Sequence, residues 1–250
     1  MHDTIAFSES LDLAGVEGSI AAVPDQHIKT EGDDITVGPN NNVIGVIACV
    51  GATGTRAKLV APSLRRVNPY DVSPLVLALF PSDLPFVNMH PGNPIPLEVN
   101  EALNAVFTAD PLAAEQETCV VFTAPGAVNP VTGKIFPVRF SVTVALLAGS
   151  YAFAAINLVD DLPNGNYAVV GADLVAATAV AFRFVPVGAA HRPGGPVRQT
   201  VANNPTPVFR FGGLGEWFTF TTVQLPGIEI LSSAAAGSTT YYGTMDVMAK

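Results

Sequence analysis

Short apolar runs recur along this chain from Val43 onward, and turn residues separate each run from the next. About a dozen such runs follow one another, among them "VIGVIACV" from residue 43, "TCVVFTA" from residue 118 and "WFTFTTVQL" from residue 217. Valine, isoleucine, threonine and aromatic residues dominate them, while 21 prolines and 22 glycines supply many of the breaks. Many short strands with frequent turns are typical of sandwiches and barrels, so the sequence predicts an all-β fold.

Helical signals are few and short. Ser73–Phe80, Asn100–Phe107 and Asp110–Glu117 each have features of a helix of about two turns. In the second of these, Asn100 could cap the amino end, and Leu103, Val106 and Phe107 follow at helical spacing. We expect such helices to lie in the loops of a β-sandwich.

The chain divides near its middle. Residues 124–133 read "APGAVNPVTG", a turn-rich stretch that we interpret as a linker between a first β-domain, residues 43–123, and a second, residues 134–250. Residues 1–42 are expected to form an irregular acidic arm that lies on a neighbouring subunit and is dispensable for the β-fold. Because residues 1–34 hold eight acids and one base, this arm should not bind nucleic acid.

Charge is scarce in this sequence. Only 13% of the residues are charged, against about 25% in an average soluble domain, while 49% are hydrophobic. Such a chain either lies in a membrane or has much of its surface covered by other subunits. Residues 142–159 carry no charge and approach the length of a membrane-spanning helix, but Gly149 and Ser150 interrupt them and strand-like residues dominate. We therefore favour subunit association.

The residues that usually carry chemistry form no recognisable site. The four histidines are interpreted as solvated loop residues, and the adjacent pairs Asp33–Asp34 and Asp160–Asp161 as turn residues whose side chains point apart. Cys49 and Cys119 lie in apolar runs and are expected to be buried thiols, although a single bridge between them stays open. The sequence thus predicts no enzyme, no metal and no cofactor.

One segment leans towards basic residues. Residues 162–215 hold a single acid, Asp173, and four arginines, and Trp217 follows in a strand with apolar residues on both faces. Arginine is enriched at protein interfaces because its fork donates two hydrogen bonds at once. The candidate residues for a subunit contact or for the inner surface of a shell are Arg183, Arg192, Arg198, Arg210 and Trp217.

The second half resembles the carboxyl-terminal region of double-jelly-roll major capsid proteins from tailless, often membrane-containing icosahedral phages. The similarity rests on "NGNYAVVGADLVAATAVAFRF" from residue 164, "HRPGG" from residue 191, "FRFGGLGEWFTF" from residue 209 and "PGIEILSS" from residue 226. It covers about 90 residues as a series of short motifs, whereas the first half has only general β-character.

This resemblance implies two jelly-roll sandwiches side by side and a structural protein of the virion without a catalytic site. Three chains would form a trimeric capsomer that self-assembles into an icosahedral shell, with other virion proteins and a possible internal membrane as partners and no sequence-specific binding of nucleic acid. The alternative is a β-sandwich binding module such as a spike, adhesin or lectin-like domain. Such a module should need more surface charge than this chain has.

Overall fold

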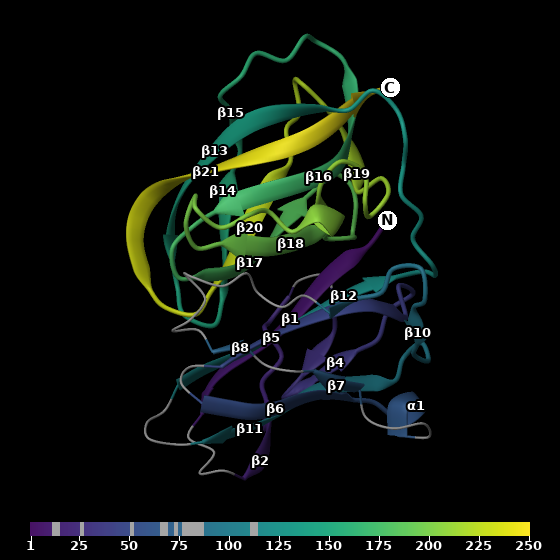
Figure 1. Cartoon of the computed structure of the whole chain (residues 1–250), viewed down its shortest axis with the longest axis vertical. Helices are drawn as coiled ribbons and strands as arrows, with labels where there is room; N and C mark the ends of the chain where they lie inside the picture. The colour runs from purple at the N-terminus through teal and green to yellow at the C-terminus, as the bar shows by residue number, and fades with distance from the viewer. Residues whose placement is uncertain are drawn as a thin grey trace. The chain divides into compact units, whose positions relative to one another are not determined.

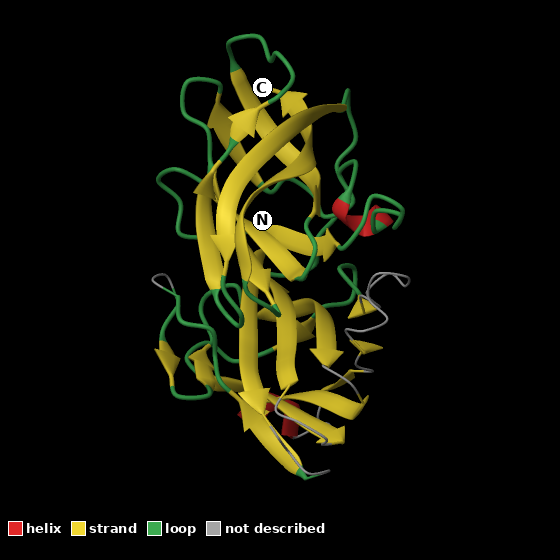
Figure 2. Ribbon diagram, turned by 90° about the vertical axis from the view of Figure 1, so that its left-hand side faces the viewer, coloured by secondary structure: helices red, strands yellow, loops and turns green. Residues whose placement is uncertain are grey.

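The computed structural model describes residues 1–11, 16–25, 28–50, 53–65, 70–72, 75–76, 88–110 and 115–250. Nearly all regular structure in these residues is β-strand (Figure 2). The described helical elements are α1 (Pro62–Arg65) and the 3-10 turn η2 (Pro207–Phe209). The prediction of an all-β chain is therefore confirmed, but the helices lie elsewhere than expected. Within the predicted helices Ser73–Phe80 and Asp110–Glu117, the described residues 75–76, 110 and 115–117 are strand, and the others lie outside the described residues.

The chain forms two compact units. The N-terminal unit comprises Ile5–Ala127, and the C-terminal unit comprises Val128–Lys250 together with Met1–Thr4. The boundary after Ala127 falls inside the linker predicted at residues 124–133. The chain passes between the units twice, after Thr4 and after Ala127.

The N-terminal unit contains two sheets (Figure 1). Its strands are β1 (Asp3–Leu11, which begins in the other unit), β2 (Glu17–Ile20), β3 (Thr30–Glu31), β4 (Asp34–Thr36), β5 (Asn42–Val50), β6 (Thr53–Val60), β7 (Tyr70–Val72), β8 (Leu75–Val76), β9 (Asn88–Met89), β10 (Ile95–Pro96), β11 (Ala102–Asp110) and β12 (Glu115–Ala124). One sheet has the order β1-β12-β5-β10, with β8 and β9 also paired to β5. The other has the order β3-β4-β11-β6-β7, with β2 paired to β11.

Strand β11 corrects the helix that was expected at Asn100–Phe107. Leu103, Ala105 and Phe107 are each 0% exposed, whereas the residues between them are only partly buried. This alternation of period two is that of a strand with one face in a core. The helical spacing was misleading because Val106, on the outer face, is also apolar.

Residues 1–42 are also more regular than predicted, since they contribute strands β1 to β4. Phe7 and Ile20 are 0% exposed and belong to the core of the N-terminal unit. The acids of this region lie outside that core: Glu17 is exposed in β2, and the Glu9 carboxylate accepts a hydrogen bond from the Ala21 amide at 2.8 Å. The expectation of an irregular arm was wrong because outward acids obscured the inward apolar residues.

The C-terminal unit contains nine connected strands. They are β13 (Phe136–Leu146), β14 (Tyr151–Ala155), β15 (Asn157–Leu158), β16 (Asn166–Val175), β17 (Ala179–Val185), β18 (Gly194–Arg198), β19 (Phe218–Thr221), β20 (Gly227–Ser232) and β21 (Ala236–Ala249). Their order is β14-β20-β17-β18-β16-β21-β13-β15, and β19 pairs with β16. All of these pairings are antiparallel except the short parallel contact of β16 with β18.

The core of the C-terminal unit is rich in aromatic residues. Phe140, Phe182, Phe184 and Trp217 are each 0% exposed. The rings of Phe182 and Phe184 meet edge to face, with centroids 5.6 Å apart. Residues 142–159, the charge-free stretch, form part of β13 and all of β14 and β15. No helix in the described residues is long and apolar enough to cross a membrane.

Cys49 and Cys119 are free, buried thiols on neighbouring strands. Cys49 lies opposite Thr118, and Cys119 lies opposite Ala48. Because consecutive residues of a strand point to opposite faces, the two sulfurs lie on different faces of the sheet. The open question of a bridge is therefore answered against it.

Candidate functional site

The five candidate residues all lie in the C-terminal unit, but they face inward. Arg183, Arg192 and Trp217 are 2%, 4% and 0% exposed. The side chains of Arg198 and Arg210 are 17% and 12% exposed. Their predicted role as subunit contacts is therefore corrected: the four arginines bind carboxylates, carbonyl groups or both within their own unit, and Trp217 is a core residue.

Arg210 binds Asp246 of β21, and Asp246 is 0% exposed. The Arg210 Nε and Nη2 atoms donate to the two carboxylate oxygens at 2.7 and 2.8 Å. The Phe211 amide donates to the same carboxylate at 2.8 Å, which holds Phe211 in a left-handed conformation with φ of 48°. The hydrogen bond to Asp246 raises the pKa of Arg210 above its ordinary value, so the pair remains ionic.

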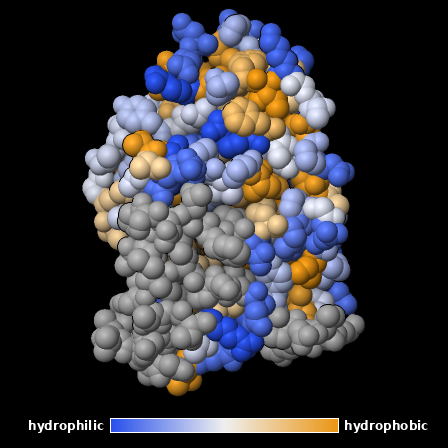
Figure 3. All heavy atoms as spheres, in the orientation of Figure 1, coloured by the Kyte–Doolittle hydropathy of each residue, from blue (hydrophilic) through white to orange (hydrophobic). Residues whose placement is uncertain are grey.

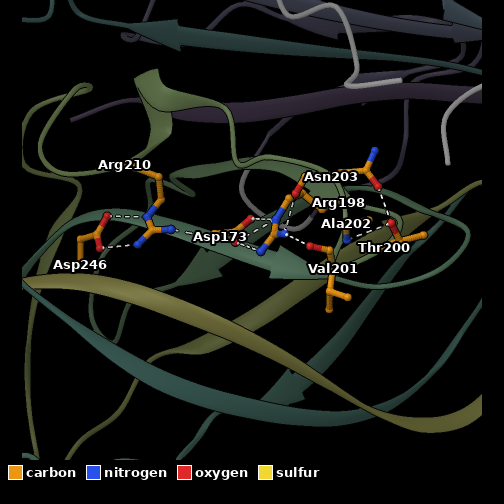
Figure 4. A network of polar contacts seen from close by, with 8 residues as sticks. All are labelled: Asp173, Arg198, Thr200, Val201, Ala202, Asn203, Arg210 and Asp246. Carbon is orange, nitrogen blue, oxygen red and sulfur yellow. Dashed lines mark hydrogen bonds and ion pairs between the residues drawn. The ribbon is translucent and has the colours of Figure 1, made fainter. Parts of the chain in front are cut away.

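A second pair continues this arrangement along the same face of the sheet. The Arg198 Nε donates to both oxygens of Asp173 at 2.8 and 2.9 Å, and Arg210 Nη1 lies 4.0 Å from the same carboxylate. Acids and arginines thus alternate in the order Asp246, Arg210, Asp173, Arg198 (Figure 4). We call these four residues the Arg–Asp ladder. Its formal charge is zero, which allows it to be buried.

The backbone of β16 explains how the ladder is covered. The pairing of β16 with β21 shifts between Val169 and Gly171, which leaves Val170 as an extra residue in a β-bulge. The Val170 carbonyl accepts a hydrogen bond from the Gly212 amide at 2.8 Å. A Cβ atom on Gly171 would lie 2.8 Å from the Phe209 carbonyl oxygen, so glycine is needed where residues 209–212 cross the strand.

The ladder also fixes the loop of residues 199–209, which we call the anchored loop. Arg198 Nη1 donates to the carbonyl oxygens of Val201 and Asn203 at 3.3 and 2.7 Å. Thr200 Oγ1 donates to the Asn203 side chain at 2.6 Å, while Val201 itself is 83% exposed (Figure 4). The loop contains no charged residue. Buried ion pairs at both ends thus hold an uncharged loop in one conformation.

Arg183 forms a separate cluster on β17. Its Nε donates to Glu229 of β20 at 2.6 Å, and its guanidinium carbon lies 3.7 Å from the centroid of the Tyr151 ring. Its Nη1 donates to the Thr4 carbonyl oxygen at 3.2 Å. This contact joins the first residues of the chain to the C-terminal unit.

Further contacts hold the Met1–Thr4 segment along residues 191–194. The Thr4 amide donates to the Arg192 carbonyl at 2.9 Å, and the Arg192 amide donates to the Asp3 carboxylate at 2.6 Å. His2 Nε2 lies 2.9 Å from the Gly194 carbonyl oxygen, and its ring meets that of Trp217 edge to face at 4.9 Å. His2 is 0% exposed, which corrects its interpretation as a solvated residue.

The other histidines also make contacts where the structure describes them. His90 Nε2 lies 2.7 Å from the Tyr70 hydroxyl, and His191 Nε2 lies 3.2 Å from the Trp217 carbonyl oxygen. His27 lies outside the described residues.

The ion pairs of the C-terminal unit are suited to holding the backbone in place. Asp173, Asp246 and Glu229 each bind an arginine, and the described residues contain no group of three or more metal-binding side chains. Sequence reasoning missed these acids as partners, although a signal was present. Asp173 and Asp246 are single acids inside apolar strands, and a buried carboxylate requires a partner.

No protein-family model, curated protein or solved structure matches this chain.

Proposed function

We propose that this chain is a structural virion protein made of two jelly rolls, which self-assembles into an icosahedral shell as trimeric capsomers. The observation that carries the proposal is the strand order. In the N-terminal unit the neighbours are β1-β12-β5-β10 and β2-β11-β6-β7, and in the C-terminal unit they are β13-β21-β16-β19 and β14-β20-β17-β18. We call these eight strands the main strands of each unit. Numbered in chain order, the first main strand pairs with the eighth, the second with the seventh, the third with the sixth and the fourth with the fifth. This nested order is the one expected of a jelly roll, and its recurrence in the second unit supports the proposal.

A β-bulge followed by a glycine occurs in both units and supports the proposal that they share one fold. In β5 the pairing with β12 skips Ile44, whose carbonyl accepts the His90 amide at 2.8 Å, and Gly45 follows. In β16 the skipped residue is Val170, whose carbonyl accepts the Gly212 amide at 2.8 Å, and Gly171 follows. The third main strand of each unit thus has a bulge, then a glycine, at the point where a later segment crosses it.

The surface supports self-association. Four of the five arginines of the C-terminal unit are committed to internal contacts, so they add little charge to a surface that is already poor in charge; the fifth, Arg139, is 67% exposed and pairs with Asp160. Apolar residues lie between polar ones over the C-terminal unit (Figure 3). The large apolar side chains that are more than half exposed there include Leu147, Phe153, Val201, Phe211 and Val223. Coverage by like chains would remove such surface from water at about 25 cal/mol per Å².

Size-exclusion chromatography with light scattering tests this proposal. We expect trimers or larger assemblies at micromolar concentration, and we expect them to persist in 1 M NaCl because apolar contacts are not screened by salt. Val201→Asp should weaken assembly, while Asn204→Asp, an exposed change in the same loop, is the matched control. A monodisperse monomer at micromolar concentration would contradict the proposal, and electron micrographs of the assemblies would show whether they are shells.

A binding module remains the second candidate because of one surface depression. This hollow of about 580 Å³ presents hydroxyl, amide and charged groups around an aromatic ring, a combination that suits a polar ligand such as a glycan. Its lining includes Asn166, Glu216, Thr219, Phe220, Gln224 and Lys250. Glycan-array binding by a stable monomer, lost in Gln224→Ala, would favour this function over the shell protein.

A further inference from the structure

We propose that Met1–Thr4 is an acid-releasable latch, held in the C-terminal unit through His2 and detached when His2 is protonated. This inference does not depend on the proposed function, since it concerns a single chain. It rests on the burial of the segment, on the charges around His2 and on the path of the chain.

The latch has a complementary site. The His2 ring is 0% exposed and lies between the Gly194 backbone and the Trp217 ring. His2 Nε2 lies 2.9 Å from the Gly194 carbonyl oxygen and 3.2 Å from the Gly194 amide nitrogen, so the tautomer of the neutral ring decides whether it donates or accepts there. Protonation would place a positive charge in a site that is shielded from water.

Two charged or titratable groups near His2 also disfavour a positive charge on its ring, namely the Met1 amino group and His191. The hydrogen bond with the Gly194 backbone acts in the opposite sense, and burial outweighs it. The Asp3 carboxylate accepts a hydrogen bond from the Arg192 amide, and Glu229 binds Arg183.

The sign of the pH dependence follows from this environment. Burial, chiefly, lowers the pKa of His2 from 6.5 to about 4. The detached segment takes up a proton below pH 6.5, whereas the docked segment resists protonation until about pH 4. Docking is thus fully favourable above pH 6.5, and its equilibrium constant should fall by roughly 100-fold between pH 7 and pH 4.

Release would separate strand β1 from the C-terminal unit. Met1–Thr4 belongs to that unit, whereas the residues of β1 from Ile5 onward belong to the N-terminal unit. Detachment would therefore leave Ile5 and the residues after it in place in the N-terminal core.

Trp217 provides the test because it is the single tryptophan of the chain and touches His2. We expect the fluorescence of the full chain to change between pH 6.5 and 4 while the far-ultraviolet circular dichroism of the β-structure is retained. His2→Gln, which cannot titrate, should abolish this transition, and His90→Gln, in the N-terminal unit, is the matched control that should keep it. A variant lacking residues 1–4 should already have the acid-form fluorescence at pH 7.

Three results would overturn the latch. The first is a wild-type chain without a fluorescence transition in this range. The second is a His2→Gln variant with the same transition. The third is a loss of circular dichroism at the same midpoint, which would indicate unfolding of the unit. Because Trp217 reports on one chain, none of these results depends on whether the protein assembles.

Discussion

Replacing Asp246 by alanine should destabilise the C-terminal unit strongly. The Asp246 residue is 0% exposed and accepts hydrogen bonds from two nitrogens of Arg210 and from the Phe211 amide. Asp246→Ala leaves a guanidinium that is only 12% exposed without its main carboxylate, and it frees the left-handed backbone at Phe211. Removing one partner of a buried ion pair costs about 3–5 kcal/mol. The remote carboxylate of Asp173, 4.0 Å from Arg210, offsets only part of this loss.

Urea unfolding followed by Trp217 fluorescence measures the effect in the correct unit, since the single tryptophan lies there. For a slope of about 2 kcal/mol per M, a loss of about 4 kcal/mol lowers the urea midpoint by about 2 M. Asp246→Asn should cost less, because its amide oxygen can still accept from the Phe211 amide.

The matched control is a surface ion pair of the same unit. Lys250 and Glu216 lie 2.5 Å apart, with side chains 44% and 35% exposed. A surface pair contributes about 0–1 kcal/mol, so Glu216→Ala should leave the urea midpoint of this unit nearly unchanged. If Asp246→Ala cost no more than Glu216→Ala in urea unfolding, the argument that the ladder anchors this unit would be refuted.

The remaining predictions concern packing and thiol chemistry. Gly171→Ala should lower the urea midpoint more than Gly45→Ala, because the new Cβ meets backbone at 2.8 Å in the first case and mainly a flexible methionine side chain in the second. Phe7→Ala should cost about 3–5 kcal/mol by leaving a cavity in the N-terminal core, and hydrogen exchange of β11 and β12 amides should report it. Cys49 and Cys119 should not react with Ellman's reagent in the native chain at pH 8 and should both react in denaturant. Burial accounts for this, raising the pKa of Cys49 to about 12 and that of Cys119 still further.

The fold class was predictable because the strand signal repeats many times. A single mistaken segment, such as Asn100–Phe107, changes little when a dozen other runs agree. The first 42 residues were not predictable in the same way. Phe7 and Ile20 occur singly among polar and acidic residues, and their partners in the core, such as Phe107, lie far along the chain. Pairing at that separation leaves no local pattern.

The candidate site was only half predictable from the sequence. Composition identified the arginines, since four of them share a segment with one acid. It placed them at subunit contacts because their local partners were missing. The partners come from elsewhere: Arg210 binds Asp246, 36 residues away, and Arg183 binds Glu229, 46 residues away. Counting the charges of residues 162–215 therefore reveals an excess of arginine over acid. It does not reveal which acids elsewhere in the chain neutralise those arginines.

The two units share a structural repeat that is hard to detect in the sequence. Their third main strands contain "VIGV" from residue 43 and "VVGA" from residue 169, a match too short to notice among so many apolar runs. The β-bulge explains this short match. The extra residue of the bulge points its carbonyl away from the paired strand, and a crossing segment donates a backbone amide to that carbonyl. The glycine that follows allows the crossing segment to approach closely. This bulge requires only an apolar residue followed by a glycine, so the other positions of the two strands can differ in sequence while the bulge is kept. In the C-terminal unit the crossing segment also carries Arg210, and the Arg–Asp ladder is built on that residue.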